Sequence, residues 1–456
     1  MLWLLSALII GGNMTGTTLF TMVNFRLKNG LEVVFLKNKI SSAASAGVLY
    51  KYGSADDDPK TYGIAHFLEH MMFKGTKQYP KGQLDEIIMR MGGSHNAYTS
   101  WDKTFYYATV PKDGLRTLLT LEADRMLNLS FDDAEVEPEK GAVKEEENMH
   151  IKNHPFGETI KIWLRTLFPV HPYGVEIIGY PEHIEAYDAQ NTRAAYQQWY
   201  APNNAVLIIS GDFEEAFIRA LVEELFGGLA ASPHITEKRV RHQDPKIEGL
   251  SRMVVQENQR ASMVFCEMAY PSPSIQEVTD PSIVMACSIA AFLLGGNDVS
   301  LLYKDLVRDK KLATNTSVSH QTGLDARHIS VDFELTPAMD VQACVAAYKS
   351  FMQDLVGHGM QQEWFKTRFE EVKNQLKGQM VFATDGTAGA IRIFDRCAEG
   401  YTAAQTNTMI GVIDMVTLDQ VQDVLRQLTA KPAGTLVIHP PGYHNNFDIS
   451  ATTSSK

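Results

Sequence analysis

A short pattern of two histidines around one glutamate constrains this 456-residue chain more than any other part of its sequence. The pattern reads His66-Phe67-Leu68-Glu69-His70, and it closely follows Gly63, near which we expect a helix to begin. On a helix, residues four apart lie on one face with their Cβ atoms about 5–6 Å apart. The spacing therefore predicts a helix that carries both imidazoles on one side, with Glu69 beside them.

Two imidazole nitrogens placed in this way can hold one Zn²⁺ at about 2.0–2.1 Å each. Glu69 projects near the same face, where it can take a proton from a water at the metal without being a ligand itself, as a general base must. The order His-x-x-Glu-His inverts the common zinc peptidase pattern and is the inverzincin signature. A five-residue match alone leaves open the alternative of two helix histidines with an incidental acid.

A third ligand is available on a later expected helix. Catalytic zinc needs three protein ligands and an open position for water. The acidic run Glu145-Glu146-Glu147 offers candidates, and Glu139 lies two helical turns before Glu146 on the same face. One carboxylate would bind the metal while the other orients a ligand histidine. The alternative is a solvated charge run, which is what most acidic helices are.

Other histidines form weaker patterns. His150 and His154 are also four apart, but Pro155 biases His154 away from helical geometry, so a second metal site there is the minor alternative. His95, next to Gly92-Gly93, is expected to lie in a loop. The sequence contains no nucleophile elbow and no P-loop motif, which argues against a serine hydrolase or a nucleotidase.

The composition narrows the functional class. Hydrophobic residues make up 45% of the chain and charged residues 21%, which is typical of a soluble globular protein. The formal net charge of −12 argues against a nucleic-acid partner and suits a basic or unfolded peptide, with plain solubility as the simpler explanation. The four cysteines form no Cys-x-x-Cys pair; we expect buried free thiols, with one disulfide as the alternative.

Residues 1–21 form an apolar N-terminal segment. The run at 2–10 is too short to span a bilayer as a helix and is typical of the core of a signal peptide. However, no Lys or Arg precedes it and no clear small-x-small cleavage site follows, and Met14 is an alternative start. The segment favours export to a bacterial periplasm, with the cytoplasm as the alternative. No other segment predicts an integral membrane protein.

The rest of the chain divides into two halves, at 22–230 and 250–445, joined by a charged linker at 231–249 without apolar periodicity. The first half opens with a hairpin, because Asn29-Gly30 is the strongest two-residue turn signal. Further elements expected in this half are strands at 46–52, 97–99, 104–110 and 205–209, and helices at 82–91, 112–128, 136–152 and 214–226. Pro138 is expected in the first turn of the helix at 136–152.

The second half repeats this mixture of elements. Its expected elements are strands around 263–268, 317, 329–335 and 434–438, a helix at 282–294, and long helices up to about 428. Strands and helices that do not alternate strictly predict α+β domains with antiparallel sheets. A polar tail follows at 446–456.

The stretch from Gly63 to Thr76, GIAHFLEHMMFKGT, resembles over its whole length the signature of the M16, or pitrilysin-like, zinc peptidases. This family includes insulin-degrading enzyme and the mitochondrial processing peptidase. Four more segments resemble the family: NAYT at 96–99, EKGAVKEE at 139–146, HPYG at 171–174 and YAPNNA at 200–205. The likeness runs from about residue 22 to 445 and is strongest before residue 215.

The resemblance implies two homologous α+β domains of the mitochondrial-processing-peptidase (LuxS/MPP-like) type, with mixed, mostly antiparallel sheets packed with helices. They would face each other across a closed chamber that excludes folded proteins. The implied zinc ligands are His66, His70 and Glu146, with Glu147 as the alternative if the alignment slips by one residue. Glu69 would be the general base.

The resemblance also implies roles outside the ligand set. Glu139 would be the acid that orients a ligand histidine. The segment at 96–99 would be the strand that pairs with an extended peptide, as in β-strand addition. Asn96, Ala97 and Thr99 are therefore the expected substrate-binding residues.

One departure from the family concerns the second half. Active relatives usually carry an Arg and a Tyr seven apart there, which hold the substrate near the zinc. Here Val307 and Thr314 occupy those positions, and Arg308 is one place off with no Tyr after it. We therefore expect the zinc-bearing subunit of a heterodimer whose homologous partner supplies the Arg and the Tyr, with a homodimer as the alternative.

The expected function is that of a zinc metalloendopeptidase that acts on peptides or unfolded polypeptides. Two other classes compete with it. A noncatalytic scaffold would resemble the family's respiratory-complex core proteins, but those have usually lost the metal motif. A peptide-binding subunit with structural zinc would need a fourth protein ligand, and the sequence offers no clear one.

Overall fold

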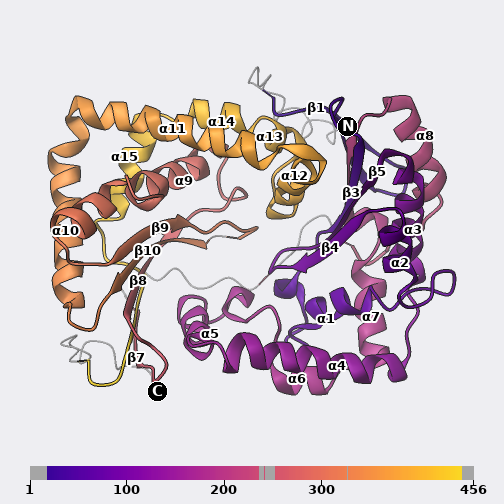
Figure 1. Cartoon of the computed structure of the whole chain (residues 1–456), viewed down its shortest axis with the longest axis horizontal. Helices are drawn as coiled ribbons and strands as arrows, with labels where there is room; N and C mark the ends of the chain where they lie inside the picture. Colours follow the sequence, from indigo (N-terminus) through magenta and orange to yellow (C-terminus); the bar gives the residue numbers. More distant parts are fainter. Residues whose placement is uncertain (1–17, 236–240, 242–251, 326, 444–456) are drawn as a thin grey trace, which may run out of the picture.

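Two mixed β-sheets, one in each half of the chain, form the frame of the structure (Figure 1). The computed structural model describes residues 18–235, 241, 252–325 and 327–443. Most of the predicted N-terminal segment 1–21, most of the predicted linker 231–249 and the predicted tail 446–456 lie outside these residues.

The first sheet has the strand order β1-β2-β6-β3-β5-β4, in which only β2 and β6 run parallel. Its strands are β1 (Thr21–Arg26), β2 (Glu32–Lys37), β3 (Ala43–Tyr50), β4 (Ser94–Thr99), β5 (Thr104–Pro111) and β6 (Ala205–Gly211). The predicted hairpin between β1 and β2 is confirmed. Gly30 has φ of +92° at this turn, and a Cβ there would lie 2.7 Å from the Cβ of Asn203, so glycine is required for two reasons.

The second sheet repeats this arrangement with the order β7-β11-β8-β10-β9. Its strands are β7 (Arg252–Glu257), β8 (Val264–Ser272), β9 (Asn315–His320), β10 (Arg327–Leu335) and β11 (Gly434–His439). The parallel pair, β7 with β11, occupies the place that β2 with β6 occupies in the first sheet. Five strands thus recur in the same spatial order, which confirms the predicted duplicated α+β fold.

Each half of the chain contains helices, most of which pack on one face of the sheet in that half. Those of the first half are α1 (Ile64–Met71), α2 (Gln83–Arg90), α3 (Leu115–Asn128), α4 (Asp133–Glu147), α5 (Gly157–Leu167), α6 (Pro181–Glu185), α7 (Ala189–Trp199) and α8 (Glu215–Phe226). Those of the second half are α9 (Pro281–Gly295), α10 (Val341–Gly357), α11 (Glu363–Ala383), α12 (Gly386–Arg392), α13 (Ala403–Asn407), α14 (Met409–Met415) and α15 (Leu418–Gln427). Within the described residues, no helix has the length and apolarity needed to cross a bilayer.

The opposite face of each sheet is covered by the other half of the chain. Val34 and Val206 of the first sheet share a buried cluster with Ile391 of α12. Reciprocally, Trp163 of α5 packs on Leu436 of β11 in the second sheet. Figure 1 shows both crossings, with α12 and α13 reaching toward β3 and α5 lying toward the second half. Because each half buries apolar strand residues of the other, the halves form one joined structure.

A buried arginine in the predicted linker also joins the halves. Only 3% of the Arg241 side chain is exposed, and its guanidinium donates to Asp56 at 2.8 Å, to Asp102 at 2.6 Å and to Asp325 at 3.1 Å. Asp56 and Asp102 belong to the first half, whereas Asp325 lies in the turn between β9 and β10. Tyr173, from the HPYG segment, donates to the same Asp102 carboxylate at 2.8 Å. Asp102, which accepts from both Arg241 and Tyr173, lies in the turn between β4 and β5.

The predicted helix at 136–152 begins earlier than expected. Asp132 caps it, because its carboxylate accepts from the amide of Ala134 and its own amide donates to Glu135. The prediction that Pro138 lies in the first turn is therefore wrong: it lies inside α4. At the other end, α4 continues into a π-helical turn, Asn148–Lys152, and π-turns often occur at functional sites.

The cysteines confirm the expectation of free thiols. Cys266, Cys287, Cys344 and Cys397 are all buried and unpaired in the described part of the chain, so the alternative of one disulfide is wrong. Burial raises the pKa of each thiol, because an apolar surrounding disfavours the thiolate.

Candidate active site

Helix α1 carries the histidine motif and is anchored at its first turn. Gly63 precedes it with φ of +95°, and a Cβ there would lie 2.3 Å from the carbonyl oxygen of Ile178. The buried carboxylate of Asp57 accepts from the amides of Gly63 at 2.8 Å and of Ala65 at 3.2 Å. These contacts satisfy free N–H groups of the first turn and hold the helix in place.

Replacing Asp57 with alanine is expected to lower the free energy of unfolding by about 2–4 kcal/mol, because the buried hydroxyl of Tyr52 and two helix amides lose their acceptor. Urea unfolding measures this loss. The exposed neighbour Asp58, replaced by alanine, serves as the control and should unfold at the wild-type midpoint. A wild-type urea midpoint for Asp57→Ala as well would show that the Asp57 contacts do not stabilise the fold.

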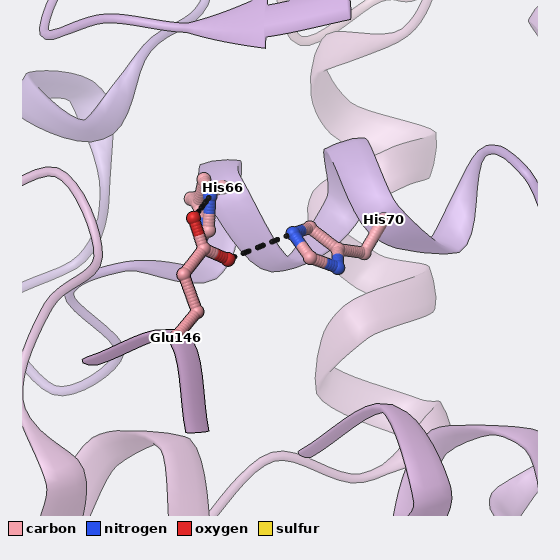
Figure 2. Close-up of side chains that lie close together, drawn as sticks. All are labelled: His66, His70 and Glu146. Carbon is pink, nitrogen blue, oxygen red and sulfur yellow. Dashed lines mark ion pairs between the residues drawn. The ribbon is translucent and has the colours of Figure 1, made fainter. Parts of the chain in front are cut away.

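Three side chains from two helices meet at one point. Nε2 of His66 lies 3.7 Å from Oε1 of Glu146, and Nε2 of His70 lies 3.3 Å from Oε2 of the same carboxylate (Figure 2). One ligand atom of each residue lies within 4.8 Å of the other two. Among the residues that the structure describes, this is the only such group of histidine, cysteine or acidic side chains that could hold a metal. The predicted convergence of α1 and α4 is thus present.

The geometry of this group fits a zinc ion. Bonds of 2.0–2.1 Å in a tetrahedron place neighbouring ligand atoms about 3.3 Å apart, close to the separations of Glu146 from both histidines. Nδ1 of His70 lies 2.8 Å from Oε1 of Glu139, whose other oxygen accepts from Lys74. A proton on Nδ1 leaves the lone pair of Nε2 directed at the group, as in carboxylate–histidine–zinc sites.

Electrostatics distinguish the two histidines. Burial, with the nearby His70, lowers the pKa of His66 to about 4. Burial would also lower the pKa of His70, but its hydrogen bonds to Glu139 and Glu146 outweigh this effect and raise it to about 9. The hydrogen bond from His70, together with Lys74, holds the pKa of Glu139 near 2. The carboxylates thus give the group a field that favours a cation.

Glu69 lies beside the group and is held by a strand. Its carboxylate accepts a hydrogen bond of 2.5 Å from Oγ1 of Thr99, at the end of β4. Burial raises the pKa of Glu69 above its ordinary value, and the bond from Thr99 partly offsets this. Sequence reasoning assigned Thr99 to substrate binding and missed this contact, because only the pairing of β4 with β5 brings it to α1.

Strand β4 is an edge strand that pairs with β5 on one side. Side chains alternate along it, so Thr99, Ala97 and His95 share the face toward α1, whereas Asn96 and Tyr98 face the opposite way. The prediction of a loop at His95 is wrong: the residue lies in β4, with Nε2 3.0 Å from Asp85. The chain enters the strand directly after the glycines that end α2. Asn96 is exposed, and its side chain accepts from the amide of Ala97.

The remaining predicted ligands lie outside the group. Glu147, the alternative to Glu146, is 2% exposed and forms an ion pair with Lys152 at 3.2 Å. His150 reaches Glu146 only at 3.9 Å, and Nδ1 of His154 accepts from a backbone amide. The minor alternative of a second metal site at these two histidines therefore finds no matching cluster in the described residues.

The segment expected to carry the substrate clamp is held within the second half. Val307 lies in a π-helical stretch, Tyr303–Asp309, and packs against the core of that half. Thr314 donates from its amide and its hydroxyl to the carbonyl of Glu334. The guanidinium of Arg308 lies over the ring of Tyr303, 5.7 Å from its centroid. At the two clamp positions, the side chain of Val307 thus packs in the second half, and that of Thr314 binds its backbone.

Known proteins share this sequence and fold. The family described as Insulinase (Peptidase family M16) matches residues 32–164, and Peptidase M16 inactive domain matches residues 187–376. Zinc protease PqqE of Helicobacter pylori is 31% identical over 65% of this chain and 66% of its own length. The uncharacterized zinc protease YmxG of Bacillus subtilis is 26% identical over 92% of this chain and 98% of its own.

Solved structures agree on the fold. A protease from Helicobacter pylori superposes with a TM-score of 0.83 at 23% identity, covering 92% of this chain and 100% of that one. The periplasmic protease PqqL of Escherichia coli gives a TM-score of 0.75 at 18% identity, covering 92% of this chain and 47% of that one. These likenesses show the fold, and the two family matches, at residues 32–164 and 187–376, show that the chain belongs to peptidase family M16.

Proposed function

We propose that this protein is a zinc metalloendopeptidase that hydrolyses peptides or unfolded polypeptides. The observation that carries the proposal is the convergence of His66, His70 and Glu146 on one point, with the carboxylate of Glu69 beside them. Three protein ligands leave a position open for chemistry, whereas a structural site would be closed by a fourth. Membership of a family whose relatives are named zinc proteases supports the same function.

Each polar residue of the site has a role in this proposal. Held by His66, His70 and Glu146, Zn²⁺ would polarise the scissile carbonyl and lower the pKa of a water to about 7. Glu69 takes the proton from the attacking water and delivers it to the leaving amine. Thr99 keeps the carboxylate of Glu69 in place for both steps.

The substrate is proposed to bind as an added strand. The edge of β4 that no strand within the described residues covers, with Asn96, Ala97 and Thr99, would pair with an extended peptide through main-chain hydrogen bonds. Such pairing requires a segment without secondary structure of its own, which selects unfolded chains over folded ones. We propose that a closed chamber adds to this selection by size.

We further propose that this chain is the zinc-bearing subunit of a two-subunit enzyme. Val307 and Thr314 stand where active relatives carry Arg and Tyr, so a homologous partner would supply these side chains; a homodimer is the alternative. In this proposal residues 22–230 form the zinc-bearing domain and 250–445 the second domain. A bacterial periplasm is the proposed compartment, with the cytoplasm as the alternative.

Zinc content and peptide hydrolysis, measured on the same sample, test the proposed function. The purified chain is expected to bind one zinc and, together with a homologous partner, to cleave an unfolded peptide. Cleavage should stop after a chelator is added and recover with added Zn²⁺. Bound zinc without hydrolysis, even with a homologous partner, would favour a structural metal. Neither zinc nor hydrolysis would favour a noncatalytic scaffold. Full activity of the chain alone, with no gain from a partner, would exclude the heterodimer.

A further inference from the structure

The end of the proposed substrate strand is bound by the second half of the chain. The hydroxyl of Tyr98, in β4, donates to the carboxylate of Asp395. Lys103, just after the strand, lies 3.1 Å from the same carboxylate and 3.1 Å from that of Glu399. Both acids belong to one short helical segment, Ile393–Glu399. One carboxylate of the second half thus binds two side chains that flank the end of β4.

These contacts are shielded from water. Only 7% of the Lys103 side chain and 23% of the Asp395 side chain are exposed, and they lie next to the buried apolar cluster that contains Phe105 and Phe394. A hydrogen bond to a charged group is stronger than a neutral one, and screening by salt is weaker where solvent is excluded. The contact is therefore stronger than a neutral hydrogen bond in open solvent.

An edge strand needs such a constraint more than its neighbours do. Among the residues that the structure describes, β4 has one neighbouring strand, β5, so half of its backbone groups hold no ladder partner there. Its side chains alternate, with Tyr98 directed to the second half and Thr99 to Glu69. A displacement of the strand at Tyr98 would therefore move the backbone groups of β4 with which the peptide is proposed to pair.

We propose that Asp395 is a positioning residue, through which the second half holds β4 in the register that an extended peptide requires. This inference rests on the proposed function. It gives the second half a role at the substrate strand, although His66, His70 and Glu146 all belong to the first half. The apolar contacts around Ile391 and Phe394 already join the two halves, so the charged contact is not needed merely to hold them together.

The test replaces Asp395 with alanine in the full-length, zinc-loaded protein. KM for an extended peptide is expected to rise about tenfold, as for the loss of one charge-assisted hydrogen bond, while kcat stays within about threefold. Tyr98→Phe removes the same bond from the other side, so the double variant should raise KM no further than Asp395→Ala alone. Asp414→Asn, at a surface acid of the same half that pairs with Lys377, is the control and should keep the wild-type KM.

Hydrogen exchange provides a readout that does not depend on turnover. Amides of β4 are expected to exchange at least about tenfold faster in Asp395→Ala, while those of α9 keep their rate. Unchanged exchange in β4, or a KM that rises equally in Asp414→Asn, would overturn the inference. If the wild type cleaves nothing, the proposed function fails, and the exchange result alone still decides whether Asp395 holds the strand.

Discussion

Replacing Glu69 with glutamine is expected to lower kcat for peptide hydrolysis by about 10²–10⁴-fold while the zinc stays bound. Glutamine has nearly the same shape, and its amide oxygen can still accept the hydrogen bond from Thr99. It cannot take a proton from water at neutral pH, so only the proposed proton transfer is lost. Glu69 is not one of the three residues that converge on the candidate metal position, so metal content should not change.

Turnover, zinc content and KM must be measured on the same Glu69→Gln sample. Glu86→Gln is a suitable control, because Glu86 is an acid of the nearby α2 whose salt bridge with Arg90 is exposed. The Glu86→Gln variant should keep the wild-type kcat and the wild-type zinc content. A Glu69→Gln variant with wild-type turnover would remove Glu69 from its proposed role, whereas one without zinc would show that Glu69 supports the metal position.

Replacing Glu146 with alanine is expected to weaken zinc binding by more than about 100-fold, because even partners that only orient a ligand typically contribute 10–100-fold. Within the described part of the chain, Glu146 is the one residue whose carboxylate faces Nε2 of both His66 and His70. Competition with a chromophoric chelator measures the affinity, and hydrolysis should fall in parallel. Added Zn²⁺ at high concentration should restore part of the activity, since Glu69 is intact.

The adjacent Glu147 provides a matched control on the same helix. Its buried carboxylate faces Lys152 and Lys161 instead of the histidines. Glu147→Ala should therefore keep wild-type zinc affinity and instead unfold at a lower temperature, because the two lysines lose a buried partner. The opposite result, with zinc lost from Glu147→Ala and kept by Glu146→Ala, would show that the ligand is one residue later.

The sequence by itself determined the local features of this protein. The spacing of His66 and His70 predicts that both imidazoles share a helix face, because the helical repeat is a local property. Asn29-Gly30 predicts the hairpin for the same reason, since the turn needs a residue that accepts positive φ, which is Gly30. The long signature from Gly63 to Thr76 was sufficient for the family, and the duplicated fold followed from it.

The tertiary structure alone decided which distant groups meet. Glu146 and Glu147 are adjacent, and helix spacing alone does not choose between them, although the family resemblance favours Glu146. The rotation of α4 against α1 turns Glu146 to the histidines and buries Glu147 against lysines. The contact of Thr99 with Glu69 depends on strand pairing across the sheet. That of Tyr98 with Asp395 joins residues 297 positions apart. Such contacts arise when distant elements pack together. They leave no repeating pattern along the sequence from which they could be predicted.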